Sequence, residues 1–127
     1  MRELDYISLH CPLNKSTKHL IDFNEIDMMK KGGFMINTSR GEIINQKALY
    51  EAVKNRKIAR AALDVLEKDP PLLQDIINTD KIIYTPHVDW NSVDAEIELR
   101  KSAAREVKRV LLGGKPANLV NREILKY

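Results

Sequence analysis

The chain has 127 residues, of which 43% are hydrophobic and 31% charged, and its formal net charge is +3; this length suffices for one modest domain with a hydrophobic core. Lysines and arginines are interspersed with acids, which does not favour a nucleic-acid-binding protein, and no apolar run approaches the roughly 18 residues of a membrane span. The single cysteine excludes an internal disulfide and the chain starts with no signal peptide, so we expect a cytoplasmic protein with no nucleic-acid or membrane partner.

Short apolar segments predict four buried strands, at residues 6–10, 34–37, 58–65 and 81–85. Helices are predicted between them. The first begins at Asp22, where the D-x-x-E pattern with Glu25 indicates a capping box, and ends at Gly32. The second follows Asn45, a residue type that caps helices, and covers residues 46–55. The longest helix covers residues 92–112 and stops at two glycines, before an irregular tail.

Strands that alternate with helices and are continuously apolar are typical of a parallel sheet covered on both faces, the doubly wound α/β fold. In such sheets ligands bind beyond the carboxyl ends of the strands. The residues at these four ends include histidine, cysteine, hydroxyl, arginine and acidic side chains, at positions 10–12, 38–40, 64–69 and His87. The sequence therefore predicts a site at one edge of the sheet.

Each candidate residue also has an ordinary structural interpretation. Arg40 could be a surface arginine, Asp64 could bind a loop amide, and His87 could be a structural histidine. Asp69 could belong to a turn before Pro70. Their delivery to the same sheet edge favours a joint role. An arginine binds a carboxylate bidentately, and a histidine exchanges protons near neutral pH, so the set suits interconversion of a 2-hydroxy acid and a 2-keto acid with a nicotinamide cofactor supplying hydride.

The same residues carry a family resemblance. The segments YISLHCPLNKSTKHLID, MKKGGFMINTSRGEIINQKALYEAV, AALDVLEKDPP and IIYTPHVDW, in this order, resemble the D-isomer-specific 2-hydroxyacid dehydrogenases. That family includes D-lactate, glycerate/hydroxypyruvate and phosphoglycerate dehydrogenases and the C-terminal-binding-protein corepressors. The resemblance implies that residues 1–91 are the second half of a Rossmann-like NAD(P)-binding domain. Residues 92–127 would be a long helix and short tail that return to the substrate domain.

The resemblance also implies roles for single residues. Arg40 would bind the substrate carboxylate, His87 would be the acid/base, and both would contact the cofactor. Asp64 would bind the nicotinamide carboxamide, and Trp90 would line the substrate pocket with Arg40 and His87. The cofactor would further be lined by Cys11, Pro12, Thr17, Thr38 and Ser39. No metal site is predicted.

Two features depart from the family pattern. The acid that pairs with the histidine is ordinarily a glutamate, and the aligned residue here is Asp69, which is one methylene shorter; Glu67, two residues earlier, is the alternative. The glycine-rich phosphate loop, G-x-G-x-x-G, is missing, because the five glycines at positions 32, 33, 41, 113 and 114 do not form it. We predict NAD as the cofactor, with NADP left open.

Three hypotheses follow. The first is an oxidoreductase fragment that transfers hydride between NAD(H) and a small D-2-hydroxy or 2-keto acid, from a parent protein that is a homodimer. The second is a non-catalytic, NAD-responsive binding module of the corepressor type. The third is a truncated fragment that is inactive by itself, with a sheet edge that would invite self-association.

Overall fold

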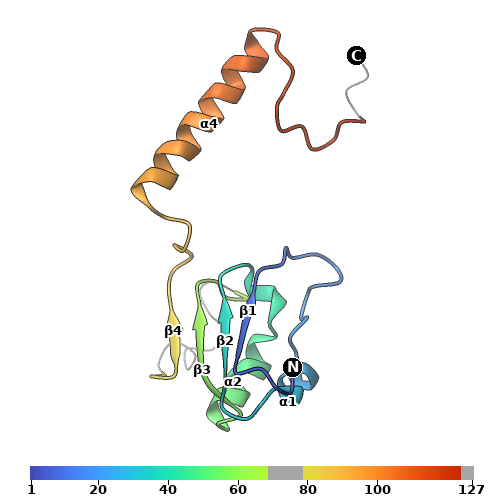
Figure 1. The fold of residues 1–127 in the computed structure, drawn as a ribbon, viewed down its shortest axis with the longest axis vertical. Coiled ribbons are helices and arrows are strands. Elements are labelled where there is room, and N and C mark those ends of the chain that lie inside the picture. Colours follow the sequence, from blue (N-terminus) through green and yellow to red (C-terminus); the bar gives the residue numbers. More distant parts are fainter. Residues whose placement is uncertain (69–78, 124–127) are drawn as a thin grey trace. The chain divides into compact units, whose positions relative to one another are not determined.

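A computed structural model of the chain describes residues 1–68 and 79–123 (Figure 1). Asp69, the predicted acid partner of His87, lies outside the described residues. The chain divides into two compact units, Met1–Asp89 and Trp90–Tyr127. The first contains the sheet and the second contains the long helix, and each is described here by itself.

The sheet of the first unit has four strands: β1 (Tyr6–Leu9), β2 (Gly33–Asn37), β3 (Ile58–Leu63) and β4 (Ile82–Tyr84). All adjacent pairs are parallel and the spatial order is β1-β2-β3-β4. The predicted α/β fold with a parallel sheet is therefore confirmed. Three of the predicted strands were slightly too long, since residues such as His10, Asp64 and Val65 belong to the loops beyond the carboxyl ends, whereas β2 begins one residue earlier than predicted.

Short helices connect these strands: α1 (Phe23–Met28), the 3-10 turn η1 (Gly41–Ile43) and α2 (Gln46–Lys54). The capping box between Asp22 and Glu25 is present, and Asn45 caps α2 by accepting from the amides of its first turn. Helix α1 ends four residues before the predicted stop at Gly32, since Met29 already has an extended backbone.

The core lies between α1, α2 and one face of the sheet. Aligned positions on this face, such as Met35, Ala61 and Ile82, are at most 6% exposed. On the opposite face Tyr6 is 64% and Ile83 is 61% exposed. Coverage of both faces was predicted; within residues 1–68 and 79–89, the described helices cover only one. The right-handed crossover rule explains this for the connections from β1 to β2 and from β2 to β3, because both strands are added in the same direction.

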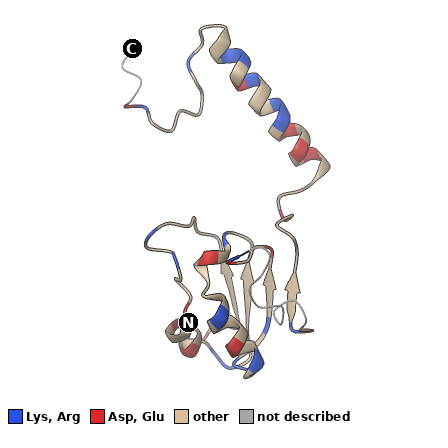
Figure 2. Cartoon of the chain, turned by 180° about the vertical axis from the view of Figure 1, so that it is seen from behind, with Lys and Arg blue, Asp and Glu red and all other residues tan. Residues whose placement is uncertain are grey.

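The second unit consists of α4 (Val93–Leu111) and the segment after it. Ser92 caps the helix, and the predicted pair of Glu96 and Arg100 is present. Acidic residues gather at the beginning of α4 and basic residues toward its end (Figure 2), an order that suits the helix dipole. No residue of α4 is buried. Among the described helices, none has the length and apolar character that a bilayer crossing requires.

Candidate functional site

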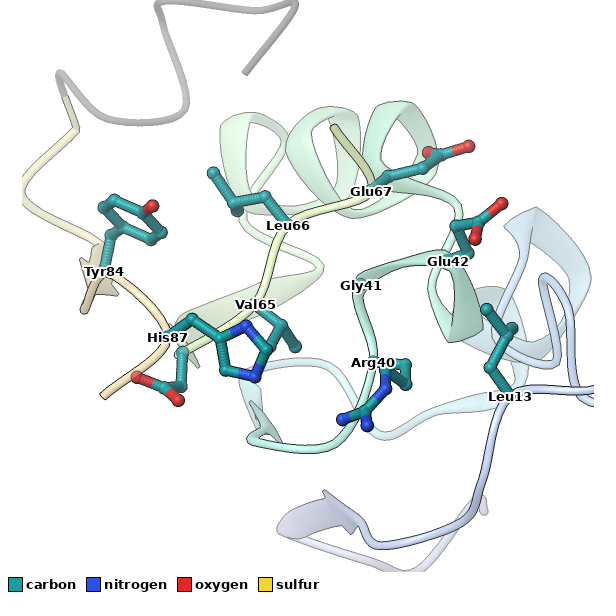
Figure 3. A pocket seen from close by; sticks show the side chains of 10 residues that line it. Leu13, Arg40, Gly41, Glu42, Val65, Leu66, Glu67, Tyr84 and His87 are labelled. Carbon is teal, nitrogen blue, oxygen red and sulfur yellow. The ribbon is translucent and has the colours of Figure 1, made fainter. Parts of the chain in front are cut away.

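A pocket of about 180 Å³ opens at the carboxyl ends of the strands in the first unit (Figure 3). It brings together three residues predicted for the site, Arg40, Asp64 and His87, which come from three different strand ends. The other lining residues are Leu13, Gly41, Glu42, Val65, Leu66, Glu67 and Tyr84. The structure thus places the arginine, an acid and the histidine around one concavity, as the strand pattern predicted.

The turn that presents Arg40 is held by Asn37, the last residue of β2, which is fully buried. Its Nδ2 donates to the Arg40 carbonyl at 2.9 Å, and its Oδ1 accepts from the Ser39 amide at 3.1 Å. Ser39 Oγ lies 3.0 Å from the Leu9 carbonyl oxygen, which ties this turn to the end of β1. Asn37 was not among the predicted site residues. An asparagine at the end of an apolar strand was the available signal, because asparagine can form such a turn.

Gly41 allows two site loops to touch backbone to backbone. A Cβ at this position would lie 1.9 Å from the Leu66 carbonyl oxygen, so no larger residue fits without displacing the backbone. The close approach fixes Arg40, which immediately precedes Gly41, relative to the loop after β3. The Arg40 guanidinium itself is exposed and donates to the Ser39 carbonyl at 2.6 Å.

Asp64 is only 3% exposed and organises the loop that carries His87. Its Oδ1 accepts from Thr85 Oγ1 at 2.6 Å and from the Val88 amide at 2.9 Å, and its Oδ2 accepts from the Asp89 amide at 3.0 Å. Burial raises the pKa of Asp64, but these hydrogen bonds and the nearby His87 outweigh it and hold the pKa below its ordinary value. The Asp64 carboxylate is therefore charged, and it holds residues on both sides of His87.

His87 has a left-handed backbone, with φ of +54°, a conformation that non-glycine residues rarely adopt and that is often found at functional sites. Its amide donates to the Asp64 carbonyl at 2.8 Å, so the strained residue is held by the strand end beside it. The His87 side chain is exposed, and Figure 3 shows its ring and the Arg40 guanidinium on the same side of the pocket. This arrangement can hold an anion and exchange a proton with it.

Comparison with known proteins agrees with this geometry. Residues 1–89 match the family model described as D-isomer specific 2-hydroxyacid dehydrogenase, NAD binding domain. The chain belongs to this dehydrogenase family. The match to an NAD-binding domain also agrees with NAD as the predicted cofactor of the family.

Individual members of the dehydrogenase family are similar along nearly the whole chain. A D-3-phosphoglycerate dehydrogenase of Methanocaldococcus jannaschii is 40% identical over 120 residues, which are 94% of this chain and 23% of that protein. A glyoxylate reductase of Thermofilum pendens is 39% identical over 127 residues, covering 99% of this chain and 38% of the reductase. The structure of D-lactate dehydrogenase with NAD+ from Lactobacillus jensenii superposes with a TM-score of 0.86 at 29% identity, covering 95% of this chain and 41% of that one. The chain therefore spans well under half the length of these relatives.

The residues of this dehydrogenase-family chain fit one part of a dinucleotide. Asp64 lines the pocket, and its Oδ2 accepts a single hydrogen bond from the described residues, so it keeps capacity to accept from an amide group. The glycines of the chain do not form a phosphate-binding loop. Asp64 is thus a residue that could hold the nicotinamide carboxamide, whereas no glycine-rich loop in this sequence would hold the pyrophosphate.

Several residues predicted to line the cofactor do not line the described pocket: Cys11, Pro12, Thr17, Thr38 and Ser39. Thr17 Oγ1 donates to the Pro12 carbonyl at 2.7 Å and thereby closes the loop from which Leu13 reaches the pocket. Trp90 is 54% exposed and is the first residue of the second unit. The binding roles of these residues, like those of the pocket residues, stay predictions.

Glu67, the alternative acid partner for His87, is engaged elsewhere. Its Oε1 lies 2.8 Å from His19 Nε2, and its Oε2 accepts from the Gln46 amide at 3.2 Å. Figure 3 shows the Glu67 carboxylate pointing away from the His87 ring. In the described residues, both carboxylate oxygens of Glu67 are therefore engaged away from His87.

Proposed function

We propose that this chain carries the proton-transfer and substrate-binding residues of an NAD-dependent dehydrogenase that interconverts a small D-2-hydroxy acid and its 2-keto acid. The observation that supports the proposal most is the meeting of Arg40, Asp64 and His87 at one pocket beyond the strand ends. The family membership and the match to an NAD-binding domain support it as well.

The chemistry follows from the side chains. NADH, when bound, would supply the hydride. The Arg40 guanidinium, exposed at the pocket, binds the substrate carboxylate in its bidentate geometry. This places the adjacent carbonyl near His87, which donates a proton to the carbonyl oxygen during reduction and takes it back in the reverse direction. Asp64 acts from below by holding the backbone on which His87 is presented.

Asp69 completes this proposal as the acid that orients His87. Its aligned position just before Pro70 supports the role, and its side chain is one methylene shorter than that of the family's glutamate. Misplacement on the scale of 1 Å can cost roughly 100-fold in rate. The parent protein would be a homodimer, as is usual in the family.

The direct test is a hybrid enzyme in which this chain replaces the aligned 127-residue segment of the Thermofilum pendens glyoxylate reductase. His87→Ala should lower kcat for keto-acid reduction at least ~100-fold, because a general acid is lost. The affinity for NADH, measured by fluorescence titration, should stay within about twofold, because only the histidine side chain is removed. His10→Ala is the matched control, since His10 immediately follows β1 at the same sheet edge and does not line the pocket.

Retained turnover in the His87→Ala hybrid would refute the role given to His87. An unsubstituted hybrid that binds NADH without any turnover would favour the non-catalytic binding module instead. We further propose that the 127-residue chain alone does not turn over, because it supplies no glycine-rich cradle for the pyrophosphate.

A further inference from the structure

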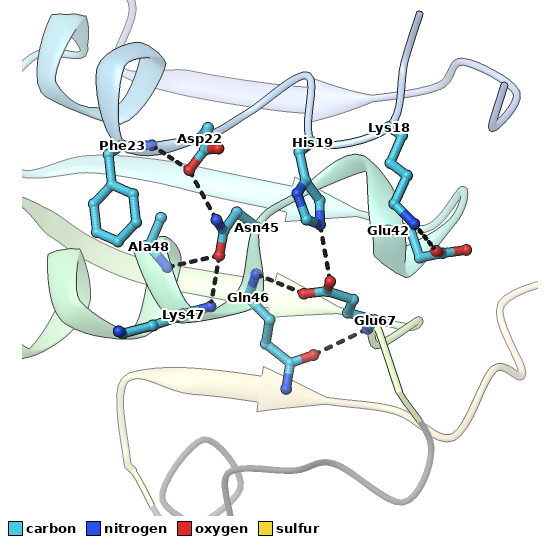
Figure 4. Close-up of polar contacts among 10 residues, drawn as sticks. All are labelled: Lys18, His19, Asp22, Phe23, Glu42, Asn45, Gln46, Lys47, Ala48 and Glu67. Atoms are coloured by element: carbon cyan, nitrogen blue, oxygen red, sulfur yellow. Dashed lines mark hydrogen bonds and ion pairs between the residues drawn. The ribbon is translucent and has the colours of Figure 1, made fainter. Parts of the chain in front are cut away.

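Glu67 is the meeting point of three segments that are distant in sequence (Figure 4). Both of its carboxylate oxygens are used, one by His19 Nε2 and the other by the Gln46 amide at the start of α2. The Glu67 amide in turn donates to Gln46 Oε1 at 2.9 Å, so the two residues bond reciprocally. Gln46 is 8% exposed, and the side chains of His19 and Glu67 are 32% and 28% exposed. The cluster is thus partly buried rather than a surface ion pair.

His19 belongs to the loop that follows β1. Its backbone is left-handed, with φ of +50°, and its amide donates to the Glu42 carbonyl at 2.8 Å. Two residues later the Ile21 amide donates to the Ile43 carbonyl at 3.1 Å. The loop is therefore hydrogen-bonded to the backbone of η1, and the His19 imidazole extends from there to the loop after β3. A residue held in a strained conformation needs surrounding contacts that maintain it.

We propose that Glu67 is a positioning residue: through His19 and Gln46 it fixes the loop formed by residues 10–20 against the loop after β3. The first loop carries three of the predicted cofactor-lining residues, Cys11, Pro12 and Thr17, and the second carries Asp64 and leads to Asp69. This proposal rests on the proposed function in one respect, namely that the fixed loop lowers the KM for NADH. Glu67 also lines the pocket, but its assigned role here is to hold the loop and not to transfer a proton.

A neighbouring ion pair provides the internal comparison. Lys18 Nζ lies 2.9 Å from Glu42 Oε1 and joins the same two segments as the His19 amide. The side chains of Lys18 and Glu42 are 56% and 39% exposed, so solvent screens their attraction and the pair adds little. Glu67, which is less exposed and makes three hydrogen bonds, should dominate the fixation of the loop.

The first test is hydrogen exchange of the 127-residue chain at the amides of residues 19 and 21. Glu67→Ala should speed exchange there at least about fivefold, because the loop loses a charged hydrogen-bond partner. Glu67→Gln should keep most of the protection, since its amide group can still bond His19 and Gln46. Lys18→Gln is the control and should change exchange less than about twofold.

His19→Gly removes the same contact from the other side, and it is a second test in case Glu67→Ala does not fold. Glycine adopts a positive φ without strain, so this change removes the imidazole while keeping the backbone conformation accessible. Protection at residue 21 should fall as it does in Glu67→Ala. If both variants leave exchange unchanged, the proposal is wrong. If Lys18→Gln has the larger effect, the exposed ion pair fixes the loop and Glu67 does not.

The second test uses the hybrid reductase. Glu67→Ala and His19→Gly should each raise the KM for NADH about fivefold with kcat for the hybrid within about twofold, as expected for lost binding without lost chemistry. Glu67→Gln should restore the KM. A fall in kcat at constant KM would instead assign Glu67 to the chemical step and overturn the proposal. An unsubstituted hybrid without activity would count against the proposed function, while hydrogen exchange in this chain would still decide whether Glu67 fixes the loop.

Discussion

Helices α2 and α4 have similar sequence patterns and opposite burial. Both have an apolar stripe and a side-chain cap at the first turn. In α2, Leu49 and Val53 are each 2% exposed, whereas in α4 Val107 is 60% and Leu111 is 80% exposed. The difference teaches that an amphipathic pattern specifies a surface to be covered, while the stabilisation comes only when another element covers it. We therefore expect substitutions in the first unit to lower the free energy of unfolding much more than substitutions in α4.

The largest contrast is expected between two glycines. Gly41→Ala would place a Cβ against the Leu66 backbone at 1.9 Å, so we expect the first unit to lose its cooperative thermal unfolding transition. Gly113 has a φ of +78° after α4, with nothing within 4 Å of an added Cβ. Gly113→Ala should cost only about 1 kcal/mol, from the left-handed backbone, and leave that transition in place. Circular dichroism during heating checks both, and an unchanged transition in Gly41→Ala would contradict the close approach.

The next contrast compares two leucines. Leu49→Ala should lower the free energy of unfolding by about 2–5 kcal/mol, because it leaves a cavity in the core. Leu111→Ala should change it by less than about 0.5 kcal/mol, since that side chain is already in solvent. Urea denaturation of the 127-residue chain measures both. An equal loss would mean that α4 is covered in solution, for example by a second copy, and sedimentation would show it.

The smallest contrast concerns two aspartates and pH. The folded-state pKa of Asp64 lies below its ordinary value of 3.8, so the folded protein binds fewer protons there than the unfolded chain. The contribution of the Asp64 carboxylate to the free energy of unfolding is therefore fully present at a pH above the ordinary pKa. This contribution is lost as the pH falls through the folded-state pKa. Asp64→Asn should cost roughly 1–3 kcal/mol at pH 7, and progressively less as the pH falls below 3.8. Asp94→Asn, in the exposed first turn of α4, should lower the free energy of unfolding by less than about 0.5 kcal/mol. If the loss of stability depended on pH equally in the two variants, the charged Asp64 carboxylate would not stabilise the fold.

Sequence reasoning succeeded where the signal is local. The four strands, the caps at Asp22 and Asn45 and the convergence of Arg40, Asp64 and His87 all follow from apolar runs, short motifs and the rule that parallel strands end at one edge. The strand ends were overestimated because β propensity continues into apolar loop residues such as Val65, whereas hydrogen bonding to a neighbouring strand does not.

The sequence did not reveal contacts that join distant segments. His19 and Glu67 are 48 positions apart, and nothing near either residue indicates the other. The need for glycine at position 41 depends on the backbone at Leu66, which only the fold brings into contact. The role of Asn37 likewise depends on a turn whose path is set by Ser39 and the end of β1.

The order of the strands bears on how the protein is made. Because β1, β2, β3 and β4 lie side by side in the order in which they occur in the chain, no strand has to be inserted between two that are already paired. Each strand leaving the ribosome finds its neighbour in the strand synthesised just before it, and domains generally fold from the amino-terminal side during synthesis. The pairing of β1 with β2 can therefore be complete before the histidine loop has been translated, so the pocket at the strand ends is completed last, on strands that are already paired.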